Sequence, residues 1–129
     1  MEKVKGKCEC GSVEFEISKY RKEVTFCHCG QCRKTSGHYW SATNAKYDDV
    51  TFIKDDTLTW YSSSDWANRG FCSVCGSSLF YRMNGEEGIG IAAGSLENPT
   101  GLVPGKHIFV KDKGDYYNIA DGIPQIDKF

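Results

Sequence analysis

The sequence predicts an all-β fold in a single small zinc-binding domain. Short runs of alternating or β-branched residues recur along the chain and are separated by turn signals. No stretch of a dozen residues shows a capped, apolar helical stripe, and no repeat occurs at solenoid or propeller spacing. In addition, all seven cysteines fall into three short clusters, which indicates metal binding.

The expected strands are short and lie between recognisable turns. Turn signals occur at Asp55-Asp56, Asn84-Gly85, Asn98-Pro99 and Pro104-Gly105. In the first expected strand, Val13, Phe15 and Ile17 share one face. The expected strands are 12–18, 50–54, 57–61, 78–81, 88–92 and 107–110.

Length and charge narrow the class of protein. The 129 residues suit one compact domain over 1–129, and a formal charge of -1 is not that of a general nucleic-acid binder. The charged N-terminus leaves no room for a signal peptide, and no apolar run reaches transmembrane length. We therefore expect a cytoplasmic protein without nucleic-acid or membrane partners. In a reducing compartment, closely spaced cysteines are metal ligands more often than disulfides.

The seven cysteines are expected to form two zinc sites. Thiolates are soft ligands that favour zinc over calcium or magnesium, and four of them close a structural site. Two clusters, Cys8-x-Cys10 and Cys72-x-x-Cys75, each precede an expected strand and are each followed by a glycine that suits a tight zinc knuckle. We expect these four cysteines to bind one structural zinc that joins distant parts of the chain.

The remaining cluster, Cys27-x-Cys29-x-x-Cys32, offers three sulfurs and so leaves one coordination position open. We expect it to hold a catalytic zinc. The alternative is that both zincs are structural, with His28 or a remote histidine as the fourth ligand of the second site.

The motifs in this order resemble the glutathione-dependent formaldehyde-activating enzyme family, which includes centromere protein V. The resemblance covers nearly the whole chain, and three cysteine clusters with these flanks are far more specific than one. The matching segments are Gly6-x-Cys8-x-Cys10-Gly11, Cys27-His28-Cys29-x-x-Cys32-Arg33, Phe71-Cys72-x-x-Cys75-Gly76, His107-Ile108-Phe109-Val110 and Asp121-Gly122-Ile123-Pro124.

The resemblance implies a fold of coiled antiparallel sheets shared with a small Rab-binding exchange factor. It also implies a structural zinc on Cys8, Cys10, Cys72 and Cys75 and a catalytic zinc on Cys27, Cys29 and Cys32. The implied activity is that of a carbon-sulfur lyase that makes or breaks S-hydroxymethylglutathione, with glutathione and formaldehyde, or another thiol and aldehyde, as partners.

The chemistry of other side chains makes them candidates for proton transfer and for substrate binding. His28, His107 or a bound water are candidate proton donors, although the ring of His28 could equally point to solvent. Arg33, Lys34 and Arg69 are candidate anchors for the two carboxylates of glutathione, or counter-charges to the thiolates. The alternative function is a non-enzymatic interaction or chaperone-like module with two structural zinc sites.

Overall fold

The structure is a computed structural model that describes residues 3–129, so Met1 and Glu2 of the predicted domain lie outside the described residues. Strands dominate, which confirms the all-β prediction. Within residues 3–129, no helix is both long enough and apolar enough to cross a membrane. The strands are β1 (Val4–Lys7), β2 (Glu14–Ile17), β3 (Glu23–Cys27), β4 (Trp40–Lys46), β5 (Val50–Lys54), β6 (Leu58–Ser62), β7 (Ala67–Cys72), β8 (Ser78–Met83), β9 (Gly88–Ala92) and β10 (Val103–Ile108); the helices are α1 (Gly30–Ser36) and the 3-10 turns η1 (Tyr47–Asp49), η2 (Ala93–Ser95) and η3 (Val110–Asp112).

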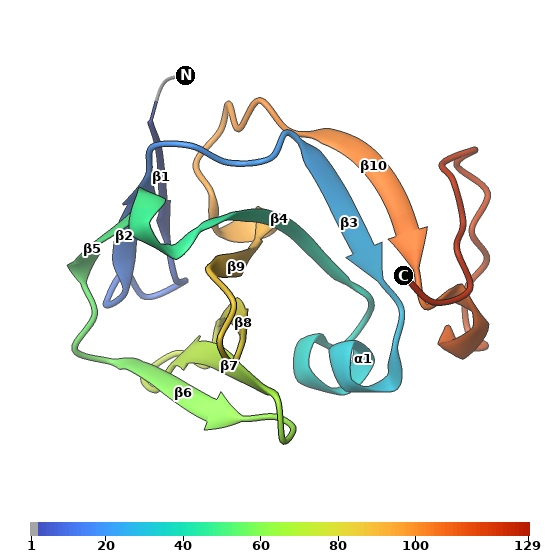
Figure 1. Cartoon of the computed structure of the whole chain (residues 1–129), viewed down its shortest axis with the longest axis horizontal. Coiled ribbons are helices and arrows are strands. Elements are labelled where there is room, and N and C mark those ends of the chain that lie inside the picture. The colour runs from blue at the N-terminus through green and yellow to red at the C-terminus, as the bar shows by residue number, and fades with distance from the viewer. Residues whose placement is uncertain (1–2) are drawn as a thin grey trace.

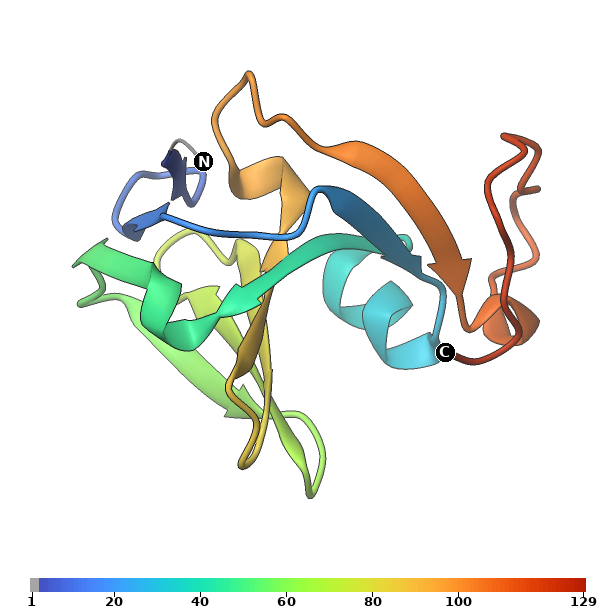
Figure 2. The same cartoon turned by 45° about the horizontal axis from the view of Figure 1, so that its top comes forward.

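The strands form two sheets of unequal size. The smaller has the order β1-β2-β5, and the larger has the order β10-β3-β4-β9-β8-β7-β6. Figure 1 and Figure 2 show that the large sheet is strongly curved, with β10 and β6 at opposite ends. All paired strands are antiparallel except β10 and β3, which run parallel at one edge.

Four strands, β1, β3, β4 and β7, were not predicted from the sequence. In β4, the buried positions are occupied by small or polar residues such as Ala42, Thr43 and Ala45, which hide the hydrophobic alternation. In β7, the register shifts at Gly70, and such a bulge interrupts the period of two.

The last strand also differs from its predicted range. It begins at Val103 and includes Pro104 and Gly105, which we expected to form a turn. The register of the β10–β3 pair shifts between Pro104 and Lys106. An edge strand tolerates proline at such an irregularity because one face of its hydrogen-bonding groups is unpaired.

The main core lies between the two sheets. Phe15 and Ile17 from the small sheet are fully buried, as the alternation in the first expected strand predicted, together with Phe80 and Ile91 from the large sheet. Phe15 and Phe80 meet edge to face, with ring centroids 5.0 Å apart. Each such side chain contributes about 1.5–3 kcal/mol through burial.

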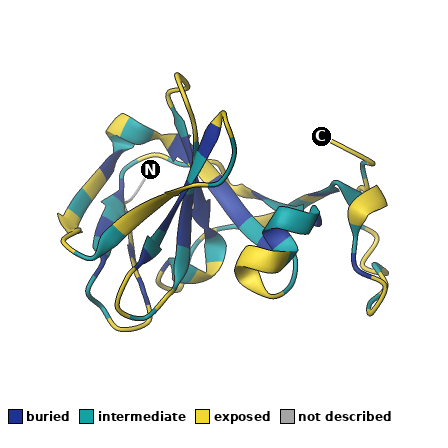
Figure 3. Ribbon diagram, turned by 90° about the horizontal axis from the view of Figure 1, so that it is seen from below, coloured by how far each residue is buried: buried dark blue, intermediate teal, exposed yellow. Residues whose placement is uncertain are grey.

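The cysteines are distributed over two hydrophobic clusters. Cys8 and Cys72 belong to the main core, whereas Cys32 packs with Trp40, Ala42 and Ala92 in a second, smaller cluster. Figure 3 shows buried residues along the middle of the strands and an exposed outer face on α1. The two groups of cysteines therefore sit in different environments of one fold.

Gly6 provides a test of the packing between the sheets. It pairs with Phe15 across β1 and β2, and a Cβ at Gly6 would overlap Cζ of Phe15. The Phe15 ring is fully buried and cannot withdraw freely, so we expect Gly6→Ala to destabilise the zinc-loaded protein by about 1–3 kcal/mol in denaturant unfolding.

Gly94→Ala is the matched control, because a Cβ there meets nothing within 4 Å. We expect this control to change stability by no more than about 0.5 kcal/mol. Equal stability of the two variants would contradict the proposed packing.

Candidate metal and active site

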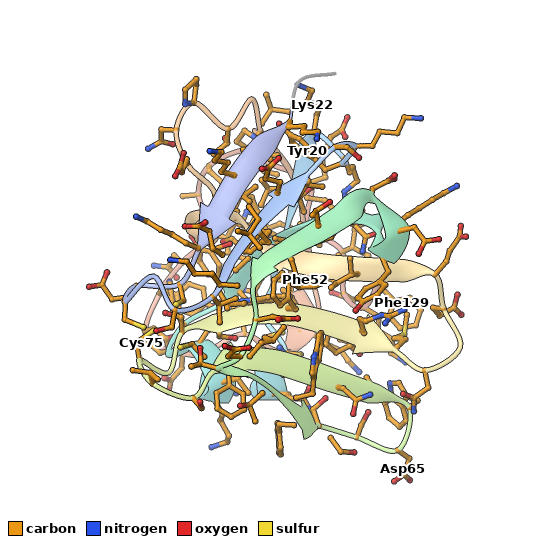
Figure 4. All side chains as sticks on the ribbon, turned by 90° about the vertical axis from the view of Figure 1, so that its left-hand side faces the viewer. Tyr20, Lys22, Phe52, Asp65, Cys75 and Phe129 are labelled. Atoms are coloured by element: carbon orange, nitrogen blue, oxygen red, sulfur yellow. The ribbon has the colours of Figure 1, made fainter. Side chains whose placement is uncertain are left out.

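The first cysteine group forms where two turns meet. Cys8 and Cys10 follow β1, and Cys72 and Cys75 begin at the end of β7. Gly11 and Gly76, the glycines after these turns, have φ of 81° and 79°, so each turn uses a conformation that favours glycine. Cys75 is labelled in Figure 4, where it lies in the turn that projects beyond the strands.

The four sulfurs have the spacing that a tetrahedral ion requires. All four Sγ atoms lie within 4.8 Å of one another, with 3.7 Å between Cys8 and Cys10 and 3.8 Å between Cys10 and Cys72. A zinc ion with four Zn–S bonds of about 2.3 Å places its sulfurs about 3.8 Å apart. This group therefore fits a closed four-thiolate zinc site.

Hydrogen-bond donors already surround these sulfurs. The Val13 backbone N–H donates to Cys8 Sγ at 3.2 Å, and the Ser77 hydroxyl lies 3.1 Å from Cys75 Sγ. The Ser77 contact is the largest of several hydrogen bonds that lower the pKa of Cys75 to about 5. Donors of this kind stabilise thiolates, which are the form that binds metal.

The second group contains Cys27, Cys29 and Cys32, and again all three sulfurs lie within 4.8 Å of one another. This segment closes into the seven-residue helix α1, which is too short to show an apolar helical stripe in the sequence. Cys29 is the N-cap, and its sulfur accepts a hydrogen bond from the Cys32 backbone N–H at 3.3 Å. The helix therefore holds two of the three sulfurs in a fixed geometry.

The three sulfurs share negative charge unequally. Hydrogen bonds from the thiols of Cys27 and Cys32 lower the pKa of Cys29 to about 2, whereas contact with Cys29 and Cys32 raises the pKa of Cys27. A divalent soft cation would remove this competition, because it deprotonates every thiol that it coordinates. The donor set thus fits a zinc ion with three protein ligands.

Within residues 3–129, no fourth protein ligand completes the second group. His28 lies between two of its cysteines, yet its ring nitrogens contact Tyr117 and His107. The ring of His28 is fully buried, so the alternative in which it points to solvent is wrong. His107 is equally occupied, because its two nitrogens contact His28 and Asp121.

These contacts form a hydrogen-bonded chain beside the second group. His28 Nε2 lies 2.8 Å from His107 Nδ1, and His107 Nε2 lies 2.9 Å from Asp121 Oδ2. Hydrogen bonds from the Ile123 backbone N–H and, to a smaller extent, from His107 lower the pKa of Asp121. The Asp121 carboxylate is therefore ionised and accepts a hydrogen bond from His107. The order is then fixed: Tyr117 donates to His28, His28 donates to His107, and His107 donates to Asp121.

The environment keeps His28 neutral at pH 7. Burial, and then the proximity of His107, lowers the pKa of His28 to about 4. Tyr117 and Asp121 were not predicted as site residues by chemistry. The Asp121-Gly122-Ile123-Pro124 motif was the signal for Asp121, and no local pattern distinguishes Tyr117 from the neighbouring Tyr116.

Arg69 is placed differently from a surface anchor. Its side chain is buried, and its Nη2 donates to Cys32 Sγ at 3.4 Å. Nε donates to Gln31 Oε1 at 2.8 Å. Arg69 therefore contacts the cysteine group directly, whereas Lys34 is exposed on the outer face of α1.

A cleft of about 780 Å³ lies next to the four-cysteine group. Cys8 and Ser77 line it together with Thr35 of α1 and Trp40 of β4. Trp40 also packs against Cys32, so the cleft adjoins the second group. Its full lining is Lys7, Cys8, Glu9, Thr35, Ser36, Trp40, Ser41, Gly76, Ser77, Ser78, Leu79, Ala92, Gly94, Ser95, Leu96 and Glu97.

Comparison with known proteins places these groups in context. A model of the family described as glutathione-dependent formaldehyde-activating enzyme matches residues 3–112. An uncharacterized lyase of Schizosaccharomyces pombe is 24% identical over 122 residues, which cover 94% of this chain and 88% of that protein. A crystal structure of a Rhodobacter sphaeroides protein aligns with a TM-score of 0.62 at 24% identity, over 95% of this chain and 98% of the other, which supports the fold.

Substitution of one cysteine in each group would test their separate roles. Cys72 is fully buried in the main core, and its group ties the N-terminal turn to β7. We expect Cys72→Ser to lower the free energy of unfolding by several kcal/mol, because metal binding energy at such a site is folding energy.

Cys29→Ser should lower stability less, because Cys29 is only partly buried beside the smaller cluster. Elemental analysis should show a fall from two zinc ions to one in Cys29→Ser, and denaturant unfolding measures the stability of both variants. If both variants unfold to the same extent, the division into a structural and an open site is wrong.

Proposed function

Since the chain belongs to the glutathione-dependent formaldehyde-activating enzyme family, we propose that it is a zinc-dependent carbon-sulfur lyase that makes or breaks S-hydroxymethylglutathione or a related thiol adduct. The observation that carries this proposal is the group Cys27, Cys29 and Cys32, which lacks a fourth protein ligand within residues 3–129. A closed structural site would have four. The open position is where a substrate sulfur would bind.

In this proposal, the two cysteine groups have different tasks. Cys8, Cys10, Cys72 and Cys75 hold a structural zinc, and Cys27, Cys29 and Cys32 hold a catalytic one. When bound at the second site, zinc would supply positive charge that keeps a substrate sulfur ionised near neutral pH. The protein then has to orient the adduct and accept its proton.

The reaction conserves electrons and needs no oxidant. In the lyase direction, the carbon-sulfur bond breaks, its electron pair leaves with sulfur, and the hydroxymethyl oxygen loses its proton as the carbonyl forms. In the reverse direction, the thiolate attacks the carbonyl carbon and the oxygen gains a proton. The protein must therefore provide an acceptor for the hydroxyl proton near the open site.

We assign this acceptor role to the Tyr117 hydroxyl oxygen. The chain of hydrogen bonds to His28, His107 and Asp121 directs the Tyr117 proton toward His28 Nδ1. As the hydroxyl oxygen accepts the substrate proton, Tyr117 passes its own proton to His28 Nδ1, His28 Nε2 passes one to His107 Nδ1, and His107 Nε2 passes one to the carboxylate of Asp121. Asp121 is half exposed at the far end, so the chain connects the neighbourhood of the cysteines with solvent.

The cleft supports a peptide-like thiol as substrate. It adjoins Trp40, which packs on the cysteine group, and the hydroxyl groups of Thr35, Ser36 and Ser95 are among its lining. Its charged side chains are Lys7, Glu9 and Glu97, so partners for both carboxylate and ammonium groups are available along it. Glutathione carries both carboxylates and an ammonium group, so a lining of this kind suits it.

Exchange spectroscopy on glutathione and ¹³C-labelled formaldehyde would test the activity, because their adduct forms spontaneously and the enzyme would accelerate interconversion. We expect the zinc-loaded protein to raise the exchange rate at equilibrium. Cys29→Ser should return the rate to the uncatalysed value, and Lys54→Ala, at an exposed position of β5 outside the cleft, should leave it unchanged. The proposal would be contradicted if the folded wild-type protein, loaded with two zinc ions, did not accelerate exchange of glutathione or cysteine adducts. That result would favour a non-enzymatic module.

The adjacent tyrosines offer a matched test of the proton acceptor. Tyr117→Phe removes the hydroxyl bonded to buried His28, and Tyr116→Phe removes the hydroxyl bonded to His38 on the surface. We expect Tyr117→Phe to slow exchange by about 100-fold, which is the lower range for a general base. Tyr116→Phe should stay within about twofold, and zinc content should not change in either variant. Equal rates for the two variants would remove Tyr117 from the mechanism.

A further inference from the structure

Arg69 is a buried cation without a carboxylate partner. Only 5% of its surface is exposed. The ion pairs found among residues 3–129 are Lys3 with Glu16 and His107 with Asp121, and neither includes Arg69. Burial of an unpaired guanidinium is costly, so a negative charge must lie nearby.

The nearest group that can carry this charge is the sulfur of Cys32. Arg69 Nη2 donates to Cys32 Sγ at 3.4 Å, and Nε is held by Gln31 Oε1 at 2.8 Å. The guanidinium also lies over two aromatic rings, 5.6 Å from the centroid of Trp40 and 4.9 Å from that of Tyr81. These contacts fix the planar guanidinium, whose N–H donors form a fork, in one orientation toward the cysteine group.

One nitrogen of the guanidinium, with its two N–H donors, remains unused. Nη1 of Arg69 is buried and has no hydrogen-bond partner. An unsatisfied buried N–H is unfavourable, and native proteins seldom retain one without a purpose. Its position on a guanidinium that already contacts Cys32 indicates that additional negative charge is expected beside this group.

The net charge of the loaded site shows which ligand would be stabilised by the Arg69 guanidinium. Three thiolates and one divalent ion sum to -1, and a neutral ligand in the open position leaves this value unchanged. A fourth thiolate changes it to -2, which is unfavourable in a partly buried site. A fixed guanidinium offsets one of these charges and so lowers the cost of binding a thiolate more than that of binding a neutral ligand.

We propose that Arg69 is a positioning residue that makes the open site prefer an anionic sulfur ligand over a neutral one. This inference rests on the proposed function, because it concerns the thiol that the second site would bind. Arg69 acts through Cys32 and through the local electric field. It is therefore distinct from a surface anchor for the carboxylates of the substrate.

Cobalt-substituted protein would test this preference without any assay of activity. Cobalt(II) bound to three thiolates absorbs visible light, and a fourth ligand changes the spectrum. The four-cysteine site has no free position and should not respond. Titrations with glutathione and with imidazole would give the affinities of an anionic and a neutral ligand at the same site.

We expect Arg69→Gln to weaken glutathione binding by about 10–100-fold, the range for a charge-assisted hydrogen bond, and to change imidazole binding by less than threefold. Arg82→Gln is the matched control. Arg82 lies on the neighbouring strand β8, and its guanidinium stacks on Tyr47 instead of contacting a cysteine. Both affinities should stay at wild-type values in this control.

Two further variants keep the test decisive. Arg69→Lys retains the charge and loses the fork, so it should bind glutathione at least threefold more weakly with imidazole binding unchanged, even if Arg69→Gln fails to fold. Gln31→Ala removes the partner of Nε, and it should reduce the preference less than Arg69→Gln does.

The outcomes separate this inference from the proposed function. The proposed function would be overturned if thiols did not change the visible spectrum of the cobalt-substituted wild-type protein. The role of Arg69 alone would be overturned by a different result. In that case the wild-type protein binds thiols, but Arg69→Lys and Arg69→Gln keep the same preference for glutathione over imidazole.

Discussion

The meeting of two turns, at which Cys10 approaches Cys72 across 62 residues of sequence, is the constraint on which the rest of the fold depends. It brings the N-terminal turn against the end of β7 and so holds the small sheet against the large one. The core residues Phe15 and Phe80 then pack between the sheets. A metal ion at this point would add its binding energy to that packing, because the unfolded chain contains no preformed site.

Strand β7 connects this constraint with the second cysteine group. Cys72 at its end contributes to the four-sulfur site, and Arg69 on the same strand reaches Cys32 of α1. The bulge between Gly70 and Phe71 lies between them and changes the alternation of the strand. Through β7, the main core determines where the guanidinium meets the sulfur of Cys32.

The proposed chemistry combines contributions from separate parts of the chain. The three sulfurs come from the end of β3 and the start of α1, whereas Tyr117 and Asp121 come from the segment after β10, beyond residues 3–112 that match the family model. This C-terminal segment runs beside β10, where the Ile126 N–H donates to the His107 carbonyl and the His107 N–H donates to the Pro124 carbonyl. A carbon-sulfur lyase needs a site for sulfur and an acceptor for a proton, and the fold brings residues suited to these tasks together.

The sequence by itself determined the all-β class, the family and the grouping of the cysteines, because these depend on local spacing. Two cysteines separated by one or two residues share a turn whatever surrounds them, and Gly11 and Gly76 take the positive φ that such turns favour. The strands with small or irregular side chains, such as β4 and β7, were missed because their burial is decided by neighbours in the sheet. Only the tertiary structure decided that His28 is buried and that Arg69 faces Cys32. Those contacts join residues 37 to 89 positions apart, and no local period records which distant side chain will occupy a shared interior.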